Sequence, residues 1–197
     1  MSRQKLFGGC YIFCLSNSKL YFTATTSIFR ADMDVTNFEQ VTRGLTSASG
    51  ITIDIHSSRL YWADEGARTI RSSNTDGSDV QTIVQFPSDT HPTGIITFGD
   101  TVYWGTWGRR SLQSCTKTGG NVRSLYDGNS NFMDLTLISS KLGANLLENV
   151  TNPCAAQVCS HLCALKPKNT FRCLCPNDKQ LLNDQNTCVH IDISAAQ

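Results

Sequence analysis

The amino-acid sequence repeats an aromatic pair at a spacing of about forty residues. The pairs begin at Tyr21, Tyr61 and Tyr103, so the tyrosines are 40 and 42 residues apart. Downstream of each pair, three apolar residues keep spacings of ten and three, namely Ile28, Phe38 and Val41; Ile70, Val80 and Ile83; and Leu112, Val122 and Leu125. A period of this length indicates a repeat architecture, which any fold assigned to the chain must accommodate.

Each copy is predicted to form four short antiparallel strands. Upstream of the second tyrosine, Ile51, Ile53 and Ile55 alternate with polar residues, as in a half-buried strand. Asp76-Gly77 and Gly119-Gly120 supply the positive φ values of tight hairpins, whereas the first copy has the weaker turn sequence Asp32-Met33-Asp34. Four strands in about forty residues make one propeller blade, and a β-sandwich would not require the fixed period.

The repeat register predicts the position of each blade. The blades cover about 10–43, 50–86 and 93–127, and one extra strand covers 132–138. The first 15 residues have a second interpretation, because two positive charges precede an apolar stretch as in a signal peptide. The register favours a strand there.

The middle copy carries a recognisable motif. Tyr61-Trp62-Ala63-Asp64 resembles the YWTD motif of the low-density lipoprotein receptor class B repeat. The copies at 21–24 and 103–106 read YFTA and YWGT and lack the acidic residue. The resemblance implies that the motif residues are structural; they are Tyr61, Trp62, Asp64, Tyr103, Trp104, Tyr21 and Phe22.

The same resemblance implies a ring of six blades, of which this chain supplies about three. The strand at 132–138 would then close the ring. A half ring leaves two apolar blade faces open, and large open faces favour association. We therefore expect a fragment of a larger receptor, with the missing blades supplied by the parent chain.

The cysteines mark a second domain. Six of the nine lie between Cys154 and Cys188, spaced C-x4-C-x3-C-x9-C-x-C-x12-C. Six cysteines allow fifteen pairings, and the spacing disfavours only a bond between Cys173 and Cys175. Paired C-x2-C units are absent, which argues against a zinc site. The pattern indicates a small module stapled by disulfides.

This spacing and its flanking residues resemble an EGF-like module. The resemblance implies the pairs Cys154–Cys163, Cys159–Cys173 and Cys175–Cys188. The domains expected are a partial propeller at 1–141, a linker at 142–153, the EGF-like module at 154–188 and a tail at 189–197. Glu148 is the only acid just before the first cysteine, so we expect no calcium site.

Several other residues are candidates for modification or binding. Asn149-Val150-Thr151 is a glycosylation sequon in the linker. Trp107, Arg109 and Arg110 form a basic aromatic loop that either contacts a ligand or is simply solvated. Outside the module, Cys10, Cys14 and Cys115 are expected to be free or buried as small apolar residues.

The predicted function follows from the resemblance, because the composition excludes only a few classes of function. The net charge is +1, and the sequence has no membrane span, nucleic-acid-binding stripe or catalytic motif. We therefore expect no enzyme, metal or cofactor. The resemblance implies an extracellular or cell-surface module that binds a protein or lipoprotein ligand, in an endocytic or Wnt-type receptor. The alternatives are a nidogen-type matrix protein and, more distantly, a metal-dependent propeller enzyme.

Overall fold

The computed structural model describes residues 11–16, 19–132, 134–136, 153–156, 158–166 and 170–191. In these ranges the regular structure consists of strands, and no helix is present. The chain divides into two compact units: residues up to Arg30 together with Phe38–Ile138, and Ala31–Asn37 together with Ser139–Gln197. The fold is all-β, as the repeat predicted.

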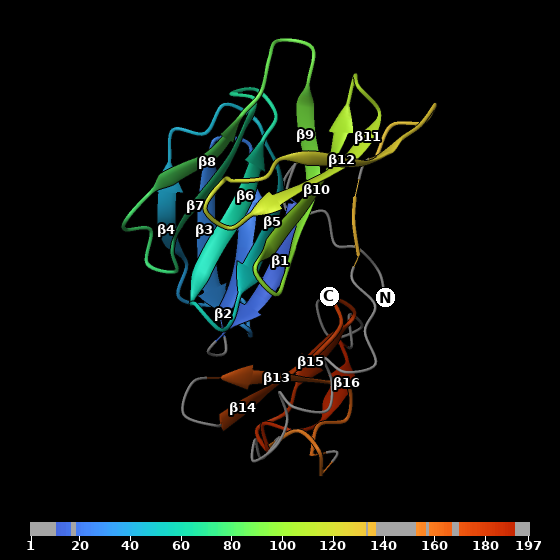
Figure 1. The fold of residues 1–197 in the computed structure, drawn as a ribbon. Coiled ribbons are helices and arrows are strands. Elements are labelled where there is room, and N and C mark those ends of the chain that lie inside the picture. The colour runs from blue at the N-terminus through green and yellow to red at the C-terminus, as the bar shows by residue number, and fades with distance from the viewer. Residues whose placement is uncertain are drawn as a thin grey trace. The chain divides into compact units, whose positions relative to one another are not determined.

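The first unit contains three antiparallel sheets of four strands, each in chain order (Figure 1). The first sheet consists of β1 (Tyr11–Ser16), β2 (Lys19–Ala24), β3 (Ser27–Asp32) and β4 (Glu39–Arg43). The second consists of β5 (Ala48–Asp54), β6 (Arg59–Asp64), β7 (Thr69–Asn74) and β8 (Gln81–Gln85). The third consists of β9 (His91–Phe98), β10 (Thr101–Trp107), β11 (Ser111–Thr116) and β12 (Arg123–Asp127). These sheets are the three blades of a partial propeller.

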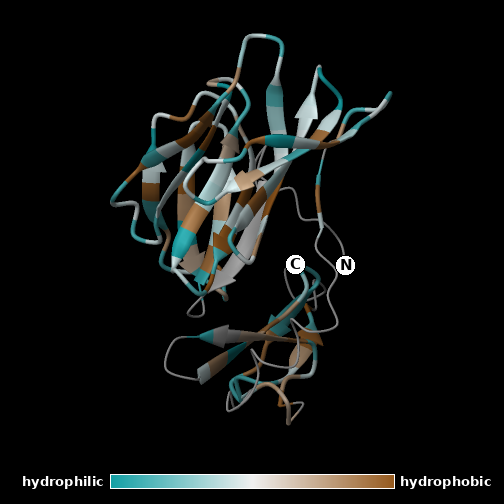
Figure 2. Ribbon diagram, in the orientation of Figure 1, coloured by the Kyte–Doolittle hydropathy of each residue, from teal (hydrophilic) through white to brown (hydrophobic). Residues whose placement is uncertain are grey.

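The core lies between the blades. Successive residues of a strand point to opposite faces, so the motif strand of the middle blade contacts the blade on each side. One buried cluster joins Tyr21 of the first blade to Trp62 of the second. The other joins Tyr61 of the second blade to Trp104 of the third. Figure 2 shows the apolar residues along the strands and polar residues in many of the turns. The aromatic pair is therefore the repeating connection between blades.

The same turn joins the last two strands of every blade. Its closing hydrogen bond runs from the Asp32, Asn74 or Thr116 amide to the Thr36, Ser78 or Gly120 carbonyl, respectively, at 2.8–2.9 Å. The residue at the tip has a left-handed conformation in each: Val35 (φ 61°), Gly77 (φ 88°) and Gly119 (φ 88°). The weak turn sequence of the first copy thus adopts the conformation that glycine provides in the others.

Glycine at this tip also allows neighbouring blades to approach closely. A Cβ on Gly77 would lie 1.9 Å from the Val41 carbonyl oxygen on β4 of the preceding blade. A Cβ on Gly119 would lie 2.3 Å from the Ile83 carbonyl oxygen on β8. Both distances are too short for any side chain. The turn glycine of one blade and the outer strand of the preceding blade therefore form a repeated contact.

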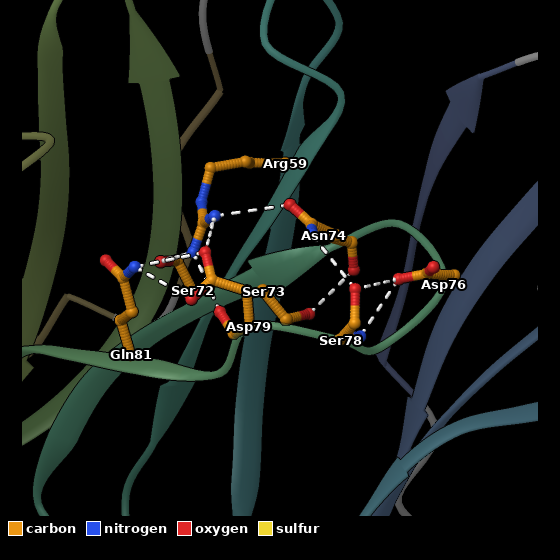
Figure 3. Close-up of polar contacts among 8 residues, drawn as sticks. All are labelled: Arg59, Ser72, Ser73, Asn74, Asp76, Ser78, Asp79 and Gln81. Carbon is orange, nitrogen blue, oxygen red and sulfur yellow. Dashed lines mark hydrogen bonds and ion pairs between the residues drawn. The ribbon is translucent and has the colours of Figure 1, made fainter.

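A polar network holds the second blade's hairpin in place (Figure 3). The Arg59 guanidinium donates to the Asp79 Oδ2 atom at 2.7 Å and to the Ser72 Oγ atom at 2.9 Å. Gln81 also donates to the Asp79 carboxylate. Asp76 accepts from both the amide and the hydroxyl of Ser78. One arginine on β6 thereby links strands β6 and β7 to the start of β8.

Two details of the repeat differ from a simple periodic pattern. Strand β5 ends at Asp54, so Ile55 lies in the following turn and is 44% exposed, instead of sharing the buried face of Ile51 and Ile53. The middle residue of each apolar triplet precedes the outer strand and is exposed, as Phe38 (57%), Val80 (50%) and Val122 (51%) show. In both cases the strand boundary decides burial, which periodicity alone does not reveal.

The segment expected as the closing strand lies beside β9. The described residues Phe132 and 134–136 carry no strand assignment. However, a Cβ on Gly94 would meet the Asp134 backbone at 2.5 Å, just as a Cβ on Gly50 would meet the Gly94 backbone at 3.2 Å. The segment thus occupies the place of a next inner strand, and its pairing with another blade stays a prediction.

The second unit is built on three disulfides and two short hairpins. Its strands are β13 (Leu162–Lys166), β14 (Thr170–Leu174), β15 (Lys179–Leu181) and β16 (Cys188–His190). β13 pairs with β14, and β15 pairs with β16. The bridges join Cys154 to Cys163, Cys159 to Cys173 and Cys175 to Cys188. This arrangement is that of an EGF-like module.

Candidate ligand-binding rim of the third blade

The acidic residue of the motif has a structural position. The Asp64 side chain is fully buried. Its carboxylate accepts backbone N–H groups of Thr46 and Ser47, before β5, and of Ala67, after β6, at 2.9–3.1 Å. Three charge-assisted hydrogen bonds tie the entry of the blade to its central turn. Asp64 therefore serves the backbone and is not accessible to a ligand.

Threonine replaces this acid in the third blade, and its hydrogen bonds join residues of a single hairpin. The Thr106 hydroxyl, also fully buried, accepts the Ser111 amide at 2.9 Å. It also lies 2.9 Å from the Ser111 hydroxyl. These bonds close the β10–β11 hairpin across its own turn. The hairpin then projects Trp107, Gly108, Arg109 and Arg110 to the surface, where all four are exposed.

The backbone of this turn is adapted to its neighbour. Gly108 (φ 88°) and Arg110 (φ 53°) are both left-handed. A Cβ on Gly108 would lie 2.5 Å from the Asp89 carbonyl oxygen, so only glycine lets the hairpin approach the β8–β9 loop. The result is a continuous rim made of the 107–110 turn and the 89–91 loop, which we call the third-blade rim.

An aromatic pair lies on this rim. Trp107 pairs with His91 across the β9–β10 ladder, with ring centroids 5.5 Å apart and ring planes at 66°. Trp107 nevertheless keeps 45% of its surface exposed. A tryptophan that is oriented by a neighbour and still accessible is suited to an interface, because its rotamer is already restricted when a partner binds.

The charges on the rim are also arranged by contacts. The Arg109 Nε atom donates to Asp89 Oδ2 at 3.1 Å, and this hydrogen bond holds the pKa of Asp89 below its usual value. Both side chains are more than half exposed, so the pair contributes little to stability. Its effect is to position one guanidinium near Trp107.

The remaining predicted residues do not join this site. Tyr21, Tyr61, Trp62 and Trp104 are buried between blades, and Phe22 and Tyr103 are half-buried. Burial raises the pKa of the Cys115 thiol to about 11, so this cysteine is protonated at neutral pH and is a poor nucleophile. Asn149 and Cys10 lie outside the described residues, and Cys14 is described only as part of β1.

Neither a metal-ligating cluster nor a helix of membrane-spanning length occurs in the residues that the structure describes. No three His, Cys, Asp or Glu side chains in these ranges group as a metal site would require. No helix in them has the length and apolar character needed to cross a membrane.

Known proteins resemble this chain in sequence and in structure. No family model matches. The vitellogenin receptor of Solenopsis invicta is 32% identical over 83% of this chain and 9% of its own length. Low-density lipoprotein receptor-related protein 5 is 36% identical in Mus musculus and 35% in Homo sapiens, over 86% of this chain and 11% of each receptor. The chain thus spans about a tenth of these curated relatives.

Solved structures match the blades. A chain in the crystal structure of the nidogen/laminin complex superposes with a TM-score of 0.53 at 25% identity, covering 58% of this chain and 46% of that one. The putative TolB from Agrobacterium tumefaciens shares the fold, with a TM-score of 0.52 at 20% identity, covering 60% of this chain and 49% of that one. Together with the YWTD motif and the EGF-like module, these matches confirm the expected resemblance, and the chain belongs to the low-density lipoprotein receptor family.

Proposed function

We propose that this chain is an extracellular protein-binding module of a lipoprotein-receptor-like protein and that the third-blade rim contacts its ligand. Its role would be ligand recognition or release in an endocytic or Wnt-type receptor. Receptors of this family are the curated relatives over most of the chain. The observation that carries the proposal is Trp107, which is exposed yet oriented by His91, with Arg109 and Arg110 beside it.

A matrix role of the nidogen type is the second candidate. The blades superpose on a chain from the nidogen/laminin complex at 25% identity. Both candidates require a protein ligand and no catalysis. They differ in the ligand, so a single binding experiment separates them.

The test measures the binding of purified vitellogenin and of purified laminin to the immobilised chain by surface plasmon resonance. The receptor proposal expects vitellogenin to bind, and the matrix alternative expects laminin. Trp107→Ala should weaken the productive interaction about tenfold or more, as for a tryptophan at the centre of an interface. Arg109→Ala combined with Arg110→Ala should weaken it further and reduce its dependence on salt.

Matched controls lie on the same blade. Phe98 is 50% exposed at the far end of β9, and Arg123 is exposed on β12. Phe98→Ala and Arg123→Ala should leave the affinity within about twofold, as expected for residues outside the contact. Binding that survives the rim substitutions, or that depends equally on the controls, would show that the ligand contacts another surface.

A further inference from the structure

The third blade has a hollow where the second blade has the polar network of Arg59. The volume of this hollow is about 200 Å³, whereas one water molecule needs roughly 10–15 Å³. The residues that line it lie 42 positions after six of the residues drawn in Figure 3. They are Thr101, Ser114, Cys115, Thr116, Asn121 and Arg123, in the places of Arg59, Ser72, Ser73, Asn74, Asp79 and Gln81. We call this space the third-blade hollow.

The second blade fills the corresponding space with one side chain. The guanidinium of Arg59 donates to Asp79, Ser72 and Asn74, and the side chain is only 18% exposed. The third blade has Thr101 at the position of Arg59. Threonine is too short to reach across the hairpin, so the space between the strands stays open.

A carboxylate neutralises the arginine of this region in each of the first two blades. Arg30 on β3 donates to the Glu39 Oε2 atom at 2.5 and 2.8 Å. Arg59 on β6 donates to the Asp79 Oδ2 atom at 2.7 Å. An arginine and a carboxylate of the same blade therefore form an ion pair at this place twice within the chain.

The third blade has an arginine here but no carboxylate. Arg123 begins β12 and pairs with Ser114 on the β11–β12 ladder, where its Nε atom donates to the Ser114 Oγ atom at 3.4 Å. Asn121, which is neutral, stands where the second blade has its aspartate. Arg123 is exposed, and within the described part of the chain no carboxylate pairs with it. The third-blade hollow thus presents a cation without its counter-charge.

A neighbouring blade does not close this place. The second blade has a blade on each side, yet Asp79 keeps 50% of its side chain exposed, and Gln81 is also exposed. Their counterparts Asn121 and Arg123 are exposed at the mouth of the hollow. The site is therefore open to a ligand at an end of the blade that packing between blades leaves free.

We propose that the third-blade hollow binds a carboxylate of an acidic protein segment, which forms with Arg123 the ion pair that the other blades form internally. A guanidinium and a carboxylate match in charge and in planar geometry. The Ser114 hydroxyl and the Asn121 amide can donate to the same carboxylate. A free small carboxylate gains little from one exposed arginine. An acidic segment presents several carboxylates at once, which raises their local concentration at the hollow.

This site is separate from the third-blade rim. Thr101 and Trp107 are the two ends of β10, so the hollow and the rim lie at opposite ends of that strand. Binding at the hollow should therefore not depend on Trp107, and Arg123→Ala should leave the rim interaction unchanged. Failure of either proposal can then be recognised without the other.

The first experiment measures the binding of a fluorescein-labelled hexaglutamate peptide to the purified full chain by fluorescence anisotropy. A hexaglutamine peptide of the same length is uncharged and should not bind. Arg123→Gln places the second blade's residue at this position and should weaken hexaglutamate binding about fivefold, the upper end for a partly exposed ion pair. Arg43→Gln removes the same charge from an exposed position on β4 and should leave the binding unchanged.

A second experiment rebuilds the second blade's network in the third blade. Thr101→Arg combined with Asn121→Asp fills the hollow with a guanidinium and supplies an internal carboxylate, so hexaglutamate binding should be lost. Asn121→Asp alone should weaken the binding, because the new carboxylate neutralises Arg123. The backbone accepts this change, since Asn121 (φ 55°) and Asp79 (φ 52°) have the same conformation. A circular dichroism spectrum of each variant should match that of the parent chain.

Four results would overturn the proposal. The first is equal binding of the two peptides, or binding of neither. The second is an equal effect of Arg123→Gln and Arg43→Gln, because net charge alone would then explain the binding. The third is a folded double variant that binds hexaglutamate as tightly as the parent chain does. The fourth is displacement of the peptide by an equal concentration of sodium acetate, which would assign the hollow to free small carboxylates.

Discussion

At the scale of single residues, Asp64 shows how one carboxylate organises a blade. It accepts three backbone N–H groups, from residues 18 and 17 positions before it and three positions after it, and it is fully buried. A buried carboxylate with full hydrogen bonding is stable, whereas buried N–H groups without an acceptor are costly.

Asp64→Asn should therefore lower the free energy of unfolding by about 2 kcal/mol, because the amide end of asparagine cannot accept a hydrogen bond. Chemical denaturation followed by tryptophan fluorescence measures the change. Asp100→Asn, in the exposed turn between β9 and β10, is the control and should change stability little. An equal effect of both substitutions would contradict the structural role of Asp64.

Val35 is the residue whose backbone is least suited to its side chain. It is β-branched, yet its φ is 61°, where glycine stands in the other blades. Val35→Gly should raise the free energy of unfolding by about 0.5–1 kcal/mol, the relief of left-handed strain less the added entropy of the unfolded chain. Val80→Gly, at an exposed position without positive φ, should instead destabilise. Stabilisation by both would mean that strain at Val35 is not the cause.

The sequence predicted some of these residues and not others. The period of the tyrosines and the apolar triplets was enough to predict blades, because burial of both strand faces requires that regularity. It was not enough for Val35, since turn propensities are local and the tertiary register imposes the turn on an unfavourable residue. Trp107 was recognised as a surface aromatic residue. Its contact with His91 depends on strand pairing that no local pattern specifies.

At the scale of elements, Asp54 and Lys117 connect two blades. Asp54 ends β5, and Lys117 follows β11, yet their side chains meet at 2.5 Å with Asp54 almost fully buried. Burial alone would raise the pKa of Asp54, but the hydrogen bonds from Lys117 and Ser57 outweigh it and lower that pKa below 3.8. The ionised form of Asp54 is thus stabilised in the folded state.

This shift has a defined pH dependence. A lowered folded-state pKa contributes stability above the unfolded pKa of 3.8. That contribution is lost as the pH falls through the folded-state pKa. Asp54→Asn should therefore unfold more easily than the parent chain at about pH 7, and the difference should shrink toward about pH 3. Urea denaturation at several pH values checks this. A difference that stays constant with pH would show that Asp54 acts through packing alone.

The end of strand β5 could not be predicted from the apolar pattern. The isoleucine alternation predicted β5 correctly up to Ile53, but Ile55 lies beyond the strand because the chain turns after Asp54. The hydrogen bonds of Asp54 to Ser57 and to the His56 amide close that turn. A side-chain contact of this kind ends a strand without interrupting its apolar pattern.

At the scale of the whole molecule, the two units are stabilised by different means. The blades have two buried apolar clusters, whereas the cysteine-rich module has three disulfides whose half-cystines are 9, 14 and 13 residues apart. Each bridge of this length contributes roughly 2–3 kcal/mol by restricting the unfolded chain. A module this small needs such bridges, because its core is small.

Reduction should therefore unfold one unit and leave the other intact. All three tryptophans lie in the blades, and Trp62 and Trp104 are almost completely buried. Dithiothreitol should make residues 154–188 sensitive to protease while tryptophan emission stays unchanged. Limited proteolysis with mass spectrometry and fluorescence report the two units separately. A red shift in emission on reduction would show that the blades depend on the bridges.

The contact between the glycine turn and the outer strand of the preceding blade bears on how repeat arrays of this kind lengthen in evolution. At both internal interfaces the later blade carries the glycine and the earlier blade carries the receiving carbonyl, so the contact is directional. A duplicated stretch of about forty residues would bring both parts with it and fit between its neighbours in one orientation only. Gene duplication could thus lengthen the array without redesigning a single interface.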